Sequence, residues 1–325
     1  MKDLEKEIKA GSFQPVYLLF GDEDYLRLQY KKKLYDALNP EGDTMNVTSF
    51  SGKDISQGEI IDLAETMPFF AERRVIFVED SGFFKNKCEE LPDYIGHLPD
   101  YLVLVFVETE VDKRGRMYKA VNKNGRATEF KSQSEATLKT WVFRRLKAEK
   151  KNITEPDLEY FLSRTGSDMC RISTELEKLL AYALEEDVIT REAIAAITSE
   201  NLENHIFDMV DAIAAKRKKR ALELYYDLLA LKEAPLKILA LIARQYRIML
   251  KIGELSAGHM SAQDMAAKLG LHPFAVKKSL PLARKYKPRQ LRQAIEEMAL
   301  LEEDVKNGRI KDSLAVELLI VRYSS

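Results

Sequence analysis

The sequence predicts an α/β domain built on a parallel sheet, followed by an all-helical second part. Up to about residue 138, short apolar runs alternate with segments of helical periodicity, which is the rhythm of a doubly wound sheet. After Trp141 the strand signal vanishes and helical patterns remain. A chain of 325 residues is longer than a single hydrophobic core usually supports, which indicates two or three domains.

The predicted strands are apolar along their length rather than alternating. Since strands covered on both faces have no solvent-facing positions, this pattern favours a parallel sheet between two helical layers. The predicted strands are residues 16–20, 45–50, 75–78, 101–107 and, more weakly, 127–130. The helical segments between them are residues 25–37, 60–66, 89–95 and 117–122. Functional loops in such sheets follow the carboxyl ends of the strands, here Gly21, Glu79-Asp80 and Glu108-Thr109.

The second part is predicted to be a small helical domain followed by a longer bundle. Thr154 is placed to cap a helix with Pro156 in its first turn, and Gly166 is placed to end it. Residues 172–184 are strongly amphipathic at helical spacing. The bundle helices are predicted at 206–215, 221–231, 235–254, 265–269, 274–283, 288–306 and 313–323.

Composition excludes several classes of protein. Lys and Arg number 51 against 52 Asp and Glu, so a net charge of −1 gives no global attraction to nucleic acid or to a membrane. Cys88 and Cys170 stand far apart without metal-ligand spacing, and we expect no disulfide dependence. The first residues lack the apolar core of a signal peptide, and no apolar run is long enough to span a bilayer. We expect a soluble cytoplasmic protein without membrane contact.

The turn after the first strand has the outline of a phosphate-binding loop without its chemistry. The working pattern G-x-x-x-x-G-K-[ST] directs backbone amides, a lysine and a hydroxyl at phosphates and magnesium. Here Gly21 is followed by Asp22, Glu23 and Asp24, with no second glycine and no Lys-Ser or Lys-Thr pair. These acids would repel a polyphosphate, while each stabilises a helix N-terminus by about 0.3–1 kcal/mol. The alternative interpretation is an ordinary α/β protein with a well-capped first helix.

No catalytic or metal-binding constellation emerges from the spacing. Glu79-Asp80 follows an apolar strand, as the metal-binding acids of nucleotide hydrolases do. In those enzymes the metal also contacts the nucleotide phosphates, and here no phosphate loop is present to hold them. The histidines are single, and none stands four residues from another as in a helical zinc site: His97, His205, His259 and His272. We therefore expect no catalytic residue, no metal and no cofactor.

Three large apolar side chains gather where a turn is predicted. Pro68 disfavours helix at Met67, so Met67, Phe69 and Phe70 fall between a helix and a strand. Turns lie on the surface, and Met and aromatic residues are enriched among the anchors of protein interfaces. This pattern indicates a docking site for another protein. The alternative interpretation is a helix end tucked under the sheet.

Basic residues form three clusters that could contact a phosphate backbone without reading sequence. One is the run of five cations at 216–220, another lies within 113–123 and a third within 277–289. None is interleaved with aromatic residues of the kind that stack single-stranded bases. The alternative interpretation for each cluster is a solvated helix face or loop.

Taken together, these segments resemble the delta subunit of the bacterial DNA polymerase III clamp loader. Residues 15–23 match its opening strand and degenerate phosphate loop, and residues 67–75 fall at its clamp-binding element. Further matches are residues 112–119, 204–207, 234–239, 244–247, 272–273 and 306–308. The resemblance implies an AAA+-like domain (1–138) with a degenerate phosphate loop, a helical lid domain (139–203) and a C-terminal helical collar (204–325) that joins subunits into a ring.

The resemblance also implies a function. Such a subunit has no catalytic activity of its own but belongs to the DNA polymerase III holoenzyme, a nucleotidyltransferase complex. It grips the sliding clamp (beta) and opens its ring, with Met67, Phe69 and Phe70 as the apolar wedge. Its implied partners are the ATPase subunits (tau/gamma) and delta prime in a hetero-pentameric ring, with primed DNA bound through the assembled complex. The absence of a Ser-Arg-Cys motif, which the partners use to reach a neighbour's nucleotide, fits the delta role.

Within that scheme, we consider four basic residues as candidates for DNA contact: Lys113, Arg114, Lys218 and Lys306. Two other functions stay open at the level of sequence. One is a divergent AAA+ ATPase with an unrecognised site, which would bind nucleotide. The other is a DNA-binding regulatory protein built on the helical half, which would bind DNA with strong salt dependence.

Overall fold

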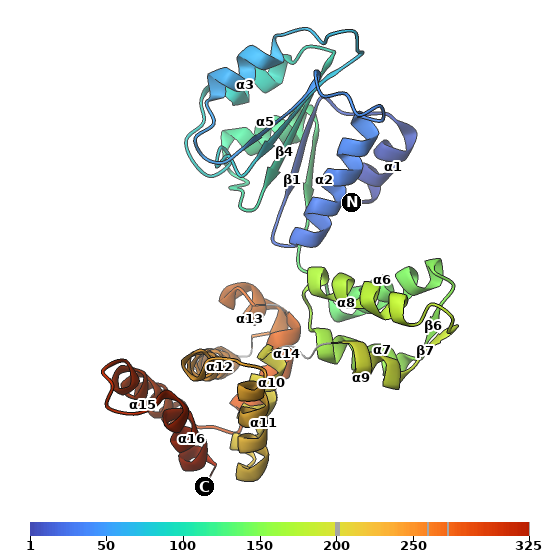
Figure 1. Ribbon diagram of the computed structural model, residues 1–325. Helices are drawn as coiled ribbons and strands as arrows, with labels where there is room; N and C mark the ends of the chain where they lie inside the picture. Colours follow the sequence, from blue (N-terminus) through green and yellow to red (C-terminus); the bar gives the residue numbers. More distant parts are fainter. Residues whose placement is uncertain (199–201, 259, 272, 325) are drawn as a thin grey trace. The chain divides into compact units, whose positions relative to one another are not determined.

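The computed structural model describes residues 1–198, 202–258, 260–271 and 273–324. The chain divides into two compact units, Met1–Gln133 and Ser134–Ser325, which we describe separately (Figure 1).

The first unit is built on a five-stranded sheet in the order β2-β3-β4-β1-β5, and every pairing in it is parallel. Its strands are β1 (Val16–Phe20), β2 (Val47–Ser51), β3 (Arg74–Glu79), β4 (Leu102–Glu108) and β5 (Arg126–Glu129). The predicted parallel sheet is thus confirmed. β2 begins two residues later than predicted, because the Asp43 carboxylate accepts the amides of Met45 and Asn46 and holds them in a turn.

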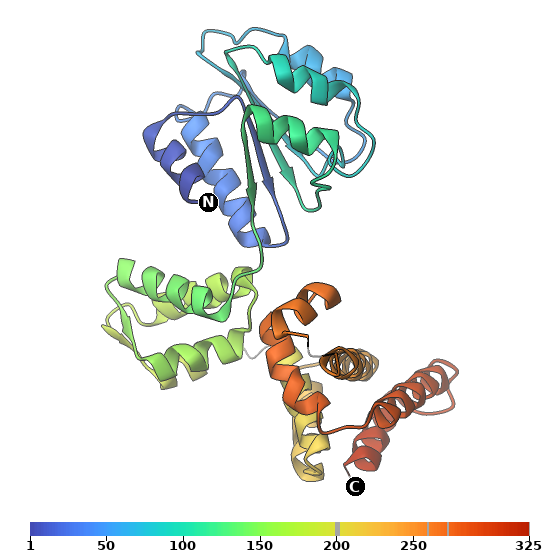
Figure 2. The ribbon, with the colours of Figure 1, turned by 180° about the vertical axis from the view of Figure 1, so that it is seen from behind.

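Helices cover both faces of this sheet, as Figures 1 and 2 show from opposite sides. The first face carries α1 (Lys2–Ala10) and α2 (Asp24–Leu38). The other carries α3 (Gln57–Ala64), α4 (Glu90–Tyr94), the short 3-10 turn η1 (Ile95–His97) and α5 (Arg116–Asn124). Leu18, Ile76 and Phe106 join the core under α3 to α5, whereas Phe77 packs against Tyr35 of α2 with ring centres 5.4 Å apart. Burial on both faces explains why the strands are apolar along their length.

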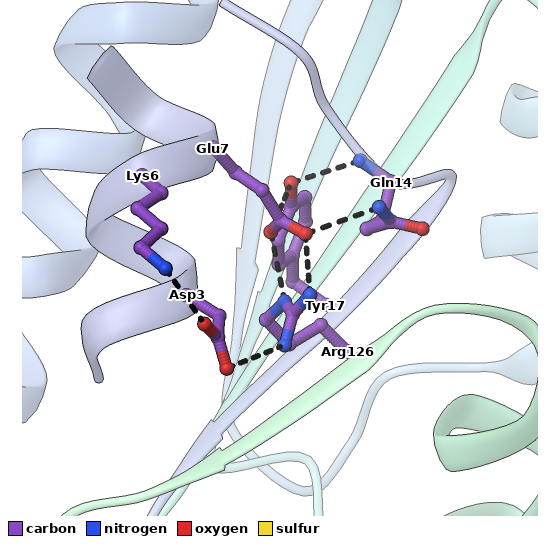
Figure 3. A network of polar contacts seen from close by, with 6 residues as sticks. All are labelled: Asp3, Lys6, Glu7, Gln14, Tyr17 and Arg126. Atoms are coloured by element: carbon purple, nitrogen blue, oxygen red, sulfur yellow. Dashed lines mark hydrogen bonds and ion pairs between the residues drawn. The ribbon is translucent and has the colours of Figure 1, made fainter. Parts of the chain in front are cut away.

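α1 was not predicted, and a polar network fastens it to the sheet (Figure 3). Arg126 of β5 donates two hydrogen bonds to the Glu7 carboxylate, from Nε at 2.8 Å and from Nη2 at 2.6 Å. The Tyr17 hydroxyl and Gln14 Nε2 also donate to Glu7, at 3.3 Å and 3.1 Å. Burial is the main cause that raises the pKa of Tyr17 to about 12, so its hydroxyl stays a donor. Glu7 is therefore the central acceptor that joins α1, β1 and β5.

The second unit begins with α6 (Glu135–Ala148), α7 (Glu155–Thr165), α8 (Met169–Tyr182) and α9 (Arg191–Ile197). The predicted cap is confirmed, since the Thr154 side chain accepts the amide of Asp157 and Gly166 ends α7 at a φ of 83°. The prediction that no strand follows Trp141 was wrong. Asn152–Ile153 (β6) and Val188–Ile189 (β7) pair in parallel, and two-residue strands are too short to show a pattern in sequence.

The rest of the second unit consists of α10 (Leu202–Ala214), α11 (Lys218–Ala230), α12 (Pro235–Ser256), α13 (Ala262–Leu269), α14 (Pro273–Ala283), α15 (Pro288–Lys306) and α16 (Asp312–Tyr323). α12 is its central helix and contacts α10, α13, α14, α15 and α16. Its buried face includes Ile242, Tyr246 and Met249. The predicted all-helical second part is confirmed apart from the β6–β7 pair.

We predict that Glu7→Ala lowers the free energy of unfolding of the first unit by about 1–3 kcal/mol, because the half-buried Arg126 and the buried Tyr17 lose their shared acceptor. Lys6→Ala is the matched control. Lys6 pairs with Asp3 at 3.9 Å with both side chains largely exposed, so its loss changes stability by less than about 0.5 kcal/mol. Urea unfolding followed by circular dichroism measures both, and equal midpoints for the two variants would contradict the role of Glu7.

Candidate functional site

The sheet has two edges, and the sequence-predicted candidates of the first unit divide between them. The Gly21 turn and Glu79-Asp80 follow the carboxyl ends of β1 and β3. Met67, Phe69 and Phe70 lie between α3 and β3, next to the amino end of β3. Since all five strands are parallel, these two groups lie at opposite edges of the sheet.

At the carboxyl edge, backbone groups of the Gly21 turn bind the sheet itself. The Gly21 amide donates to the Glu108 carbonyl at 3.3 Å, and the Glu23 amide donates to the Phe130 carbonyl at 3.1 Å. A Cβ atom at Gly21 would lie 2.1 Å from the Phe130 carbonyl oxygen, and φ is 125°. The close approach of the segment after β5 therefore accounts for the glycine, and two amides that could meet a phosphate are already used.

The three acids of this turn also have local roles. Asp22 accepts the Ser132 hydroxyl at 2.7 Å and the Ser132 amide at 3.2 Å. Asp24 pairs at 2.9 Å with the buried Arg27, whose guanidinium also donates to the Gly21 carbonyl. Glu23 is the N-cap residue of α2 and is buried. Asp22 and Asp24 thus tie the turn to Ser132 and Arg27 and keep negative charge beside it.

Acidic residues at the carboxyl ends of β3 and β4 also have partners within the chain. Glu79 pairs with Lys31 at 2.5 Å, and Asp80 accepts the Thr109 hydroxyl at 3.2 Å. Glu108 is almost fully buried and accepts the amide and hydroxyl of Ser81. Burial raises the pKa of Glu108 above its ordinary value, although the bonds from Ser81 and Gly82 oppose the shift. The acids at this edge therefore have hydrogen-bond or ion-pair partners within the chain.

At the other edge, residues 67–70 form an exposed apolar loop. The exposed fractions are 73% for Met67, 55% for Phe69 and 95% for Phe70. The two phenylalanine rings pack edge to face with centres 4.5 Å apart. Phe70 has a φ of 50°, a left-handed conformation that is strained for a side chain of this size. The three side chains are directed to solvent rather than tucked under the sheet.

Two buried polar residues hold this apolar loop, and sequence reasoning missed both. Asn46 exchanges two hydrogen bonds with the backbone of Phe69, at 2.6 Å and 2.8 Å. Arg74 donates to the carbonyls of Thr66 at 2.6 Å and Met67 at 3.1 Å. The available signal was weak: an asparagine just before a strand and an arginine as the first residue of an apolar strand.

Comparison with known proteins places the chain in a family. Residues 17–131 match the family described as "DNA polymerase III, delta subunit", and residues 203–323 match the family described as "DNA polymerase III delta subunit, C-terminal domain". The chain belongs to the DNA polymerase III delta subunit family.

Two curated relatives and one solved structure agree with this assignment. The Bacillus subtilis protein named "DNA polymerase III subunit delta" is 28% identical over 98% of this chain and 96% of its own length. An Aquifex aeolicus protein named "Probable DNA polymerase III subunit delta" is 25% identical over 70% of this chain and 67% of its own. The structure titled "Bacillus subtilis DNA clamp loader delta protein (YqeN)" superimposes with a TM-score of 0.79 at 26% identity, covering 99% of both chains.

The four candidate DNA-contacting residues of this delta-family chain lie in both units. Lys113 and Arg114 precede α5, Lys218 begins α11 and Lys306 ends α15. Lys113 pairs with Glu129 at 2.8 Å, Arg114 with Asp112 at 3.2 Å and Lys306 with Glu302 at 2.6 Å. To bind a phosphate, each of these three side chains would have to leave its carboxylate partner or contact both groups at once. Lys218 is exposed on the first turn of α11.

Over residues 1–198, 202–258, 260–271 and 273–324, no group of three or more His, Cys, Asp or Glu side chains is placed to hold a metal ion. Among the same residues, no helix is both long and apolar enough to cross a bilayer. His259 and His272, two of the singly placed histidines, lie outside the described residues.

We predict that the stability of Glu108→Gln relative to the unmodified chain increases as pH rises from about 4.5 through the raised pKa of Glu108. Since the pKa of Glu108 is raised on folding, the folded state holds this proton more tightly than the unfolded state does. Stability therefore falls as pH rises from the ordinary value of 4.5 through the raised pKa, and an amide removes that dependence. Urea unfolding at a series of pH values measures the difference.

Glu110→Gln is the control for this pH series. The exposed Glu110 has a pKa lowered mainly by the hydrogen bond from Lys85, so its own stability contribution changes below pH 4.5. Above that pH its difference from the unmodified chain should stay constant. A flat difference for Glu108→Gln over the same range would contradict the effect of burial.

Proposed function

We propose that this chain is the clamp-gripping subunit of a DNA polymerase III clamp loader. In this proposal it binds the sliding clamp (beta) through Met67, Phe69 and Phe70 and opens the clamp ring, so that the ATP-driven loader can place it on primed DNA during replication. The observation that supports the proposal most is the exposure of these three side chains on one loop, with 95% of Phe70 open to solvent. Large exposed apolar groups at a turn are characteristic of interface anchors.

The size of the apolar loop is adequate for this task. Full burial of a Met or Phe side chain is worth about 1.5–3 kcal/mol, so three of them can anchor an interface. Opening a ring requires more than tight binding, because a binder shifts a conformational equilibrium only by its differential affinity for the two states. The apolar loop must therefore fit the open clamp better than the closed clamp.

The carboxyl edge supports a non-catalytic role. The Gly21 turn, with Asp22, Glu23 and Asp24, is stabilised by bonds within the chain and carries negative charge where a polyphosphate would sit. In this proposal it is a degenerate phosphate loop on an AAA+-like domain, and the ATPase subunits (tau/gamma) supply the energy. The chain itself then needs no catalytic residue or cofactor.

The proposed place of the chain in the loader follows from the family. We propose an AAA+-like domain at residues 1–138, a lid domain at 139–203 and a collar at 204–325 that joins tau/gamma and delta prime in a hetero-pentameric ring. Lys113, Arg114, Lys218 and Lys306 are proposed as DNA contacts within that assembly, which would act in the cytoplasm. A near-neutral chain is expected to bind DNA weakly by itself.

We predict that the double variant Phe69→Ala, Phe70→Ala weakens binding to the purified clamp by at least about a hundredfold, because two anchors of about 1.5–3 kcal/mol each are lost. Both side chains are exposed, so the unfolding midpoint should not fall. Phe143→Ala is the matched control, since Phe143 is a 47% exposed phenylalanine on α6. Surface plasmon resonance measures the affinities, and unchanged binding by the double variant would remove the apolar loop from the interface.

We also predict that the isolated chain shows no saturable heat on calorimetric titration with ATP and Mg²⁺. The amides of Gly21 and Glu23 already donate to sheet carbonyls, and the neighbouring acids repel phosphate. A saturable isotherm would contradict this prediction and favour a divergent ATPase instead.

A further inference from the structure

The apolar loop is anchored from both ends by buried side chains that lie outside it. Asn46 is 2% exposed and Arg74 is 6% exposed, whereas the side chains of the loop are open to solvent. Neither anchor can contribute directly to a partner surface, because both are covered. What they contribute is the conformation of the backbone that carries Met67, Phe69 and Phe70.

Asn46 exchanges two hydrogen bonds with the Phe69 backbone, as paired residues of neighbouring strands do. Its Oδ1 accepts the Phe69 amide at 2.6 Å, and its Nδ2 donates to the Phe69 carbonyl at 2.8 Å. The same Nδ2 donates to the Asp43 carboxylate at 2.6 Å. Since that carboxylate and the Phe69 carbonyl can only accept, the orientation of the amide group is fixed. Both backbone groups of Phe69 are thereby bound to one buried side chain.

Arg74 holds the entry to the apolar loop. Its guanidinium donates to two consecutive carbonyls, Thr66 and Met67, which follow the C-cap residue Glu65 of α3. The backbone amide of Arg74 donates to the Tyr101 carbonyl at 2.9 Å, so the residue that carries the guanidinium is fixed at the start of β3. A lysine could not reproduce this pair of bonds, because an ammonium group lacks the planar fork of donors.

Phe70 lies directly after the residue that Asn46 fixes. Its left-handed φ of 50° would be relieved if the backbone were free to relax, and its ring would then be free to move away from solvent. The bonds at Phe69 and at Thr66 and Met67 remove that freedom. The strained, exposed conformation therefore persists because the surrounding structure determines it.

We propose that Asn46 and Arg74 are positioning residues that preorganise the apolar loop for the sliding clamp, which rests on the clamp binding proposed above. A flexible loop loses conformational entropy when it docks, and a loop already held in its docking conformation loses little. Asn46 and Arg74 thus raise the affinity for the clamp without touching it.

The test compares Asn46→Ala with the unmodified chain in three measurements. The first is clamp affinity by surface plasmon resonance, which we expect to fall about tenfold. The second is hydrogen exchange of the peptide spanning residues 66–73, where we expect protection at the Phe69 amide to be lost. The third is clamp affinity in a Phe70→Ala background. There we expect Asn46→Ala to lower the affinity by no more than about threefold, because the Phe70 ring that Asn46 helps to position is already absent.

Two further variants separate positioning from general stability. Glu7→Ala weakens the same unit through a network that does not include the apolar loop, so clamp affinity should be unchanged. Arg74→Lys keeps the charge but loses the forked bonds to Thr66 and Met67, and should weaken clamp binding at least about threefold. It also provides the test should Asn46→Ala fail to fold.

The outcomes are distinct. Clamp affinity that survives Asn46→Ala and Arg74→Lys, but is lost in Phe69→Ala, Phe70→Ala, would overturn the positioning role while leaving the proposed function intact. An equal loss from Glu7→Ala would also overturn it, since the effect would then follow stability. Failure of the unmodified chain to bind the clamp would overturn the proposed function and this inference with it.

Discussion

The parallel pairing of β1 between β4 and β5 is the constraint on which the N-terminal unit depends. Because all five strands run in one direction, every strand begins at one edge of the sheet and ends at the other. The close approach of the Gly21 turn to Phe130, and the attachment of α1 through Glu7 and Arg126, both follow from this pairing. The two edges can then serve different purposes without interfering with each other.

The hydrogen-bonding groups at the two edges find their partners in different ways. At the carboxyl edge, the Gly21 amide donates to the Glu108 carbonyl, and the Glu108 carboxylate accepts the Ser81 amide, so polar groups bind other polar groups of the same edge. At the amino edge, buried Asn46 and Arg74 satisfy backbone groups of a loop whose apolar side chains are exposed to solvent. A buried polar group that is fully hydrogen-bonded specifies one conformation, and here that conformation displays apolar surface.

The main elements of the fold and the apolar loop were predictable because their signals are local. Continuous apolar runs marked the strands, and Pro68 placed Met67, Phe69 and Phe70 in a turn. The misses share a cause. α1 shows a short pattern that packing alone fixes, the two-residue strands β6 and β7 have no pattern at all, and the residues before β2 were assigned to a strand although Asp43 holds them in a turn.

The sequence by itself determined a parallel α/β unit, a helical second part, a glycine turn rich in acids and a turn rich in apolar side chains, because each is encoded by neighbouring residues. The tertiary structure alone decided which polar groups hold the apolar loop in place and attach α1 to the sheet. Asn46 meets Phe69 across 23 positions, and Glu7 meets Arg126 across 119. No local periodicity carries such pairings, since they arise only when the strands are aligned and a buried polar group must find whichever partner the sheet brings within reach.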